Sequence, residues 1–145
     1  MGWTVINFRG NEFTADDAQM EVWLHFLVKQ IDLLSNPEPW LREAREDWYK
    51  ETIKGPSSGV APDLDYFITT QGRRDQLLEL CTEALRKIES FGEYLSQDVL
   101  NAMKIGGEGS YFVDSLPTER FLRSGRFFIK LLDGSLKPDE SDSRI

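Results

Sequence analysis

The chain has 145 residues, of which 40% are hydrophobic, 29% charged and 12% aromatic, a composition that excludes a disordered chain and fits one folded domain. Its 17 basic and 25 acidic side chains give a formal net charge of −8, which argues against nonspecific binding to nucleic acid or anionic membranes and favours a basic partner. One Cys and one His leave little room for metal or nucleophile chemistry.

Location in the cell is predicted from two negative features. Cys81 has no second cysteine to pair with, which favours a reducing compartment. The first residues lack the basic stretch and apolar run of a signal peptide, and the apolar run at 22–28 is too short to span a bilayer. We therefore expect a cytoplasmic protein with no membrane partner.

The chain opens on a segment typical of a short strand. Residues 3–8 are rich in β-branched and aromatic side chains, with Ile6 and Phe8 on one face. A lone strand needs a partner, and two segments bounded by helix and strand breakers are candidates, namely residues 65–68 and 110–113.

Two helices are predicted next. The first begins at Thr14, which caps it, with Asp17 at the capping-box position. Its apolar side chains cover most sides as far as Leu34, so we expect a central helix packed by several neighbours. The second begins with Asn36 as cap and Pro37 in the first helical position. Its buried stripe consists of Trp40, Leu41, Ala44 and Trp48.

Residues 55–62, rich in Gly, Pro and Ser, are predicted to form a loop inside one domain. A third helix follows from its Thr70 cap to a stop at Gly92. A short fourth helix runs from a Ser96 cap to 106–107, and a last one from Pro117 to Gly134. The predicted fold is mainly α: a single-domain bundle of about five helices with one or two minor strands over residues 1–137, followed by a disordered acidic tail at 138–145.

For each residue or segment that could take part in catalysis or ligand binding, a purely structural role fits the sequence better. His25 is either a general base or metal ligand, or a half-buried helix residue, and the lack of a second His favours the latter. Cys81 lies in an apolar row and is expected to be a small core residue. The segment Gly106–Gly109 has the composition of a phosphate loop without its flanking strand and helix, so a flexible turn is predicted. We expect no enzyme activity, no cofactor and no metal.

Acidic side chains form the most informative pattern. Glu43, Asp47 and Glu51 recur every four residues on the second helix, on the face opposite the buried stripe, and are expected to be exposed. Paired carboxylates for glycosidase or metal chemistry would need an apolar pocket that raises one pKa, whereas these lie on polar faces or loops. They are either an ordinary solvated surface or a site for a basic partner; the candidate partner-binding residues are Glu43, Asp47, Glu51, Asp63, Asp65, Glu79 and Glu83.

Basic residues gather on one side of the last helix, at three- and four-residue spacing. We call them the basic stripe; they are Arg120, Arg123, Arg126 and Lys130. The stripe either forms salt bridges with the acidic helices or binds nucleic acid. Because residues 110–145 hold six acids and six bases, the segment lacks the excess positive charge of a nucleic-acid-binding domain, which disfavours direct nucleic-acid binding.

Several segments resemble small helical bacterial proteins of toxin–immunity systems in their general character and in their order along the chain; they are residues 65–70, 73–78, 91–95, 116–122 and 127–134. The resemblance implies an immunity protein of the contact-dependent growth inhibition or a related polymorphic-toxin system. Such a protein binds a cognate toxin domain, often a nuclease, and blocks its active site or substrate path. No catalytic residues carry over from this resemblance. The alternative function is a non-enzymatic regulatory or scaffold module with another protein partner.

Overall fold

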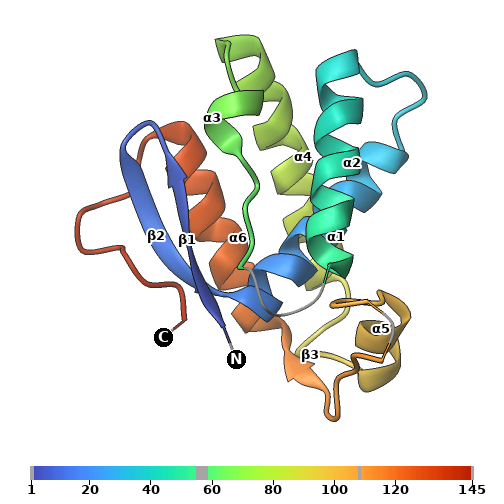
Figure 1. The fold of residues 1–145 in the computed structure, drawn as a ribbon. Coiled ribbons are helices and arrows are strands. Elements are labelled where there is room, and N and C mark those ends of the chain that lie inside the picture. The colour runs from blue at the N-terminus through green and yellow to red at the C-terminus, as the bar shows by residue number, and fades with distance from the viewer. Residues whose placement is uncertain (1, 55–58, 108, 145) are drawn as a thin grey trace.

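The computed structural model describes residues 2–54, 59–107 and 109–144, which form six helices and two antiparallel sheets of two strands each (Figure 1). The mainly α fold is confirmed. The helices number six instead of five because Leu64–Phe67 forms a short helix, α3, where a strand was a candidate.

The N-terminal strand pairs with the residues that directly follow it. Strands β1 (Trp3–Phe8) and β2 (Asn11–Asp16) form a hairpin with Trp3 opposite Asp16 and Phe8 opposite Asn11. Arg9 and Gly10 connect them with φ angles of 50° and 83°, the left-handed pair that suits a two-residue hairpin turn. Both predicted partners of β1 were therefore wrong, because Gly10 turns the chain back on itself and does not simply end a strand.

Helix α1 (Asp17–Asp32) begins three residues later than predicted. Thr14 lies in β2 and is not a cap, and Asp16 at the N-cap makes no side-chain hydrogen bond to the helix, so the capping-box prediction was wrong. The predicted central position is confirmed, since α1 packs against α2 (Pro39–Ile53), α4 (Gln71–Glu89) and α6 (Thr118–Asp133).

Helix α2 begins with Pro39, not Pro37, in its first turn, and Glu38 occupies the N-cap. Its predicted stripe is buried as expected. The indole Nε1 of Trp48 donates a hydrogen bond of 2.7 Å to the carbonyl of Pro62, which fixes the segment that follows the helix. Of the predicted loop 55–62, residues 55–58 lie outside the described residues.

The later caps agree with the prediction. The hydroxyl of Thr70 accepts a hydrogen bond from the Arg73 amide at the start of α4, and that of Ser96 accepts one from the Val99 amide at the start of α5 (Gln97–Ala102). Helix α6 ends at Gly134, with a φ of 82°. The second sheet was not predicted; it joins β3 (Tyr94–Leu95) to β4 (Leu116–Pro117).

The C-terminal segment, predicted to be disordered, lies along the outer edge of β2. The Thr14 amide donates to the Ser141 carbonyl and the Ser143 amide donates to the Thr14 carbonyl, both over 2.8 Å. Ser143 is buried, and its hydroxyl also donates to the Thr14 carbonyl. The edge of β2 would otherwise expose unpaired backbone groups, which accounts for this pairing. In Figure 1 the C-terminal segment accordingly runs beside the hairpin.

No helix formed by the described residues combines the length and apolar character needed to cross a bilayer.

Replacing Gly125 tests how closely α6 approaches α1. A Cβ there would lie 2.5 Å from Cζ3 of the fully buried Trp23 and 2.9 Å from Cδ2 of Leu85, which is partly buried against the core. We expect Gly125→Ala to lower the free energy of unfolding by about 1–3 kcal/mol in urea denaturation, because overpacking displaces rigid neighbours. Gly72→Ala is the matched control: its Cβ would meet only Oγ1 of Thr70 at 4.0 Å. That variant should gain up to about 1 kcal/mol from reduced backbone entropy. Equal effects of both substitutions would contradict this packing.

Deleting residues 138–145 tests the tail. We expect the deletion to lower the free energy of unfolding by about 1–3 kcal/mol, because three hydrogen bonds to Thr14 are lost. Hydrogen exchange of the Thr14 amide should become faster. Deleting only residues 144–145 keeps the pairing and should change neither value. A disordered tail would leave the stability of both truncated chains equal to that of the intact chain.

Candidate functional site

Acidic side chains of α2 and of the residue before α3 share one surface. Glu43, Asp47 and Glu51 follow one another along α2, and Asp63 immediately precedes α3. The pKa of Asp47 is raised, first by partial burial and then by the carboxylates of Glu51, Asp63 and Glu43, whereas Lys50 lowers it. A carboxylate influences another only at short range in salt water, so these four form one cluster, named here the α2–α3 acidic surface.

The four acids differ in how accessible they are. Glu43 and Asp63 are exposed and Asp47 is half-buried. Glu51 accepts hydrogen bonds from Nζ of Lys54 at 2.8 Å and from the Ala61 amide at 2.6 Å, and its side chain is only 15% exposed. The expected exposure was therefore wrong for Glu51, because it anchors the segment after α2. Glu43, Asp47 and Asp63 remain the acids that a partner can reach.

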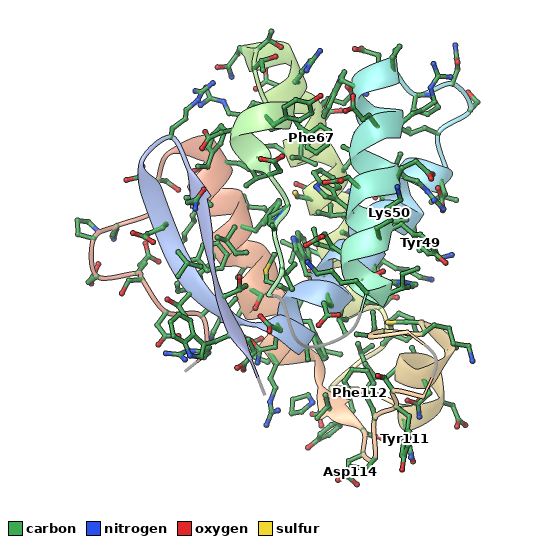
Figure 2. All side chains as sticks on the ribbon, viewed as in Figure 1. Tyr49, Lys50, Phe67, Tyr111, Phe112 and Asp114 are labelled. Atoms are coloured by element: carbon green, nitrogen blue, oxygen red, sulfur yellow. The ribbon has the colours of Figure 1, made fainter. Side chains whose placement is uncertain are left out.

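Helix α3 attaches this surface to the hairpin. The Tyr66 hydroxyl donates a hydrogen bond of 2.9 Å to Oε1 of Glu43, and Oδ1 of Asp65 accepts one of 3.0 Å from the Arg9 amide in the hairpin turn. In Figure 2, Phe67 lies between α3 and α2, where its ring meets that of Trp48 edge-on at 6.0 Å. Asp65 therefore extends the acidic surface toward the hairpin while also holding α3 in place.

Two exposed tyrosines were missed in the sequence: Tyr66 lies beside the acids, whereas Tyr49 lies on another side of α2, toward residues 101–107 and 109–111. Tyr66 is 56% exposed and Tyr49 41% exposed, and the Arg45 guanidinium lies 5.1 Å from the centre of the Tyr49 ring. Figure 2 shows Tyr49 and Lys50 together on α2. The available signal was the position of Tyr49 outside the buried stripe. Exposed tyrosines beside charged groups are the residue type that most often anchors protein interfaces.

The two remaining predicted acids lie elsewhere. Glu79 and Glu83 are exposed on α4, which packs against α1 and α6, and neither influences the pKa of Asp47. Glu83 pairs with Arg86 on its own helix. The structure therefore does not bring these acids into the α2–α3 acidic surface.

The basic stripe is partly neutralised by nearby acids. Arg126 pairs with Glu119 over 2.7 Å, and Lys130 pairs with Glu140 in the C-terminal segment. These partners belong to α6 and the tail, not to the acidic helices that were expected to provide them. The pairing reduces the positive field that nucleic-acid binding would need.

His25 lines a mostly apolar cavity of about 690 Å³ between α1, the end of α4 and α5, together with Phe26, Phe91 and Met103. Burial, with a smaller contribution from Lys29, lowers its pKa to about 4 against the opposing effect of Asp32, so the imidazole is neutral near pH 7. Among the described residues, Asp32 is the one carboxylate in the cavity lining, and it already binds the Arg45 guanidinium at 2.8 Å. This cavity therefore lacks the predicted acids that a catalytic histidine would need beside it.

The other candidate for reactive chemistry is enclosed. Cys81 is fully buried, and burial raises the pKa of its thiol. Among residues 2–54, 59–107 and 109–144, no group of three or more His, Cys, Asp or Glu side chains could hold a metal ion.

Two buried acids on α1 stand apart from the surface cluster. Asp17 and Glu21 are each 6% exposed, and neither Oδ1 of Asp17 nor Oε2 of Glu21 has a hydrogen-bond partner among the described residues. Burial raises the pKa of both, that of Glu21 to about 7, with the Asp17 and Glu51 carboxylates adding to the effect and Lys54 opposing it. The helix dipole stabilises acidic side chains in the first turns of a helix, and such residues are ordinarily exposed. Sequence analysis therefore did not predict that Asp17 and Glu21 are buried.

Glu21 gives stability a measurable pH dependence. Its folded-state pKa of about 7 exceeds the ordinary value of 4.5, so the folded state holds more protons between these pH values and stability falls as pH rises through them. We expect Glu21→Gln to raise the free energy of unfolding at pH 8 relative to the parent chain by about 2–3 kcal/mol more than it does at pH 4.5.

The measurement is urea denaturation of both chains from pH 4.5 to 8. His25, whose pKa is lowered from 6.5 to about 4, contributes a slope of opposite sign in the same window, because the unfolded state then binds more protons. Taking the difference between the two chains removes that contribution. A difference that does not change with pH would contradict the burial of Glu21.

No protein-family model, curated protein or solved structure matches this chain. Function is therefore proposed from the side chains themselves.

Proposed function

We propose that the chain is an immunity protein that binds and neutralises a cognate bacterial toxin domain, a basic nuclease, by covering its active site or substrate path. The supporting observation is the α2–α3 acidic surface, where Glu43, Asp47 and Asp63 lie close enough for their charges to raise one pKa. The resemblance of several segments to toxin–immunity proteins agrees with this function.

Electrostatics explains why such a surface suits a nuclease. Acids held close together repel one another, which slightly destabilises the folded state. An approaching cation relieves this repulsion, so binding a cation is favourable. A nuclease cleft presents cations that bind phosphate. Carboxylates placed in that cleft replace the phosphates and block the substrate, and the opposite charges accelerate the encounter.

Affinity needs more than exposed charge, because exposed ion pairs contribute little and are screened by salt. Tyr66 supplies rigid aromatic area beside the acids, and its hydroxyl is already held by Glu43. An interface centred on this ring would bury it and leave the acids around it to set orientation.

The deciding experiment is growth rescue. Its first step is a search for a toxin domain encoded immediately upstream of this chain, which is then expressed alone and together with the chain. We expect the chain to restore growth and to inhibit cleavage of nucleic acid by the purified toxin domain. Absence of rescue, with the chain expressed and folded, would contradict the immunity function and favour the regulatory or scaffold alternative.

The contribution of the acidic surface is measured by charge reversal. We expect the double variant Glu43→Lys, Asp47→Lys to slow association with the toxin domain at least about tenfold at low salt, because a steering field has been inverted. The double variant Glu79→Lys, Glu83→Lys on α4 has the same charge change away from this surface and should change the rate less than about twofold. Equal rates for the two double variants in stopped-flow mixing would show that the partner docks elsewhere.

A further inference from the structure

The buried acids of α1 line a pocket. A cavity of about 420 Å³ lies where the start of β1, the first turns of α1 and the start of α6 come together, near the lower end of the hairpin in Figure 1. Asp17 and Glu21 line it on the α1 side, while Trp3, Leu116 and Phe121 provide apolar surface. The cavity thus combines two carboxylates with an apolar wall.

The chain backbone closes tightly on one of these carboxylates. The Asp17 amide donates a hydrogen bond of 3.1 Å to the Gly2 carbonyl, and a Cβ at Gly2 would lie 2.1 Å from Oδ2 of Asp17. Only glycine therefore allows this approach without displacing the carboxylate. Asp17 is enclosed, and its Oδ1 still lacks a hydrogen-bond partner among the described residues.

We propose that this pocket binds the guanidinium or ammonium end of a basic side chain presented by the partner protein. The cationic group meets Asp17 and Glu21, and the aliphatic stem lies along Trp3 and Leu116. The inference rests on the proposed function insofar as it takes the partner to be a basic protein.

Two observations favour an organic cation. The carboxylates are nine-tenths buried, and one oxygen of each lacks a hydrogen-bond partner among the described residues, an arrangement that is unfavourable for the charged form unless a cation or a donor satisfies it. The apolar wall matches the methylene stem of a Lys or Arg side chain, which is commonly buried along apolar surface. A metal ion fits less well, because the described residues provide no third ligand.

Two cations of the described residues lie near the pocket acids without pairing with them, while the N-terminal amino group lowers the pKa of Asp17. Lys54 influences the pKa of Glu21, but its Nζ binds Glu51 at 2.8 Å. Arg120 lines the pocket and is exposed, and within the described part of the chain it makes no ion pair with Asp17 or Glu21.

Binding of a cation at this pocket requires Glu21 to lose its proton. The charged and titratable groups that face Glu21 are Asp17, Glu51 and Lys54, with Asp16, Arg120 and the N-terminal amino group around the pocket. Burial first, and then Asp17 and Glu51, raise the pKa of Glu21 while Lys54 lowers it, so affinity for a cation increases as pH rises through 7. The pocket therefore binds its cation more tightly at pH 8 than at pH 6.

The test is an NMR titration of the full chain with n-butylguanidinium, observing the Trp3 indole and Leu116 methyl signals. We expect saturable shifts with n-butylguanidinium and none with n-butylurea, its uncharged isostere. The Kd should be at least about tenfold weaker in Glu21→Gln and several-fold weaker at pH 6 than at pH 8. Glu79→Gln is the matched control and should leave the Kd unchanged.

Three results would contradict the proposed pocket. They are no saturation with n-butylguanidinium up to about 100 mM, equal shifts with n-butylurea, and an unchanged Kd in Glu21→Gln. Glu21→Gln removes a buried charge and is expected to fold, so its result is interpretable. Thermal denaturation of the variant confirms folding before the titration.

The source of the cation is tested with two further probes, a capped Gly-Arg-Gly peptide and spermidine. A partner side chain requires the peptide to bind at least as tightly as n-butylguanidinium. Spermidine binding more than tenfold tighter than the peptide would overturn a protein source. Growth rescue without n-butylguanidinium binding would overturn the pocket alone, whereas binding without growth rescue would overturn the immunity function and leave the pocket.

Discussion

The enclosure of α1 is the constraint on which the rest of the structure depends. Trp23 is fully buried, its ring meets that of Phe128 edge-on at 5.9 Å, and Gly125 provides the space for this approach. A helix that is apolar on nearly all sides is stable in water only when other elements cover it. Helices α2, α4 and α6 do so, which turns the polar face of α2 outward and draws the acids at the start of α1 inward.

Local signals predicted the local structure well. The extent of β1, the caps Thr70 and Ser96 and the stop at Gly134 each depend on side chains within a few residues, so sequence spacing was sufficient. The prediction that Thr14 caps the first helix was wrong because two sequence patterns compete at this position. The spacing of Thr14 from Asp17 fits a helix cap, but pairing with Val5 across the hairpin and with the C-terminal segment, which is distant in sequence, satisfies its backbone.

In the candidate site, too, sequence patterns predicted the features that depend on nearby residues and missed those that depend on distant ones. Four-residue spacing correctly placed Glu43 and Asp47 together on one face of α2. The role of Glu51 depends on the Ala61 amide, and the position of Asp63 depends on a short helix that sequence patterns did not predict. Glu21 is the clearest case, because an acid in the second turn of a helix is ordinarily exposed. Its burial follows from how α2 and the hairpin enclose α1, which spacing along one helix does not reveal.

The two sets of acids act through different physics. Glu43 and Asp63 are exposed, so their field extends into solvent, accelerates encounter and weakens with added salt. Asp17 and Glu21 lie where water is largely excluded, so a cation bound there is screened far less and its loss leaves two buried charges unpaired. In a complex with a basic partner, the surface acids would control association, while the buried acids would control dissociation. High salt would then slow formation of the complex much more than it would shorten its lifetime.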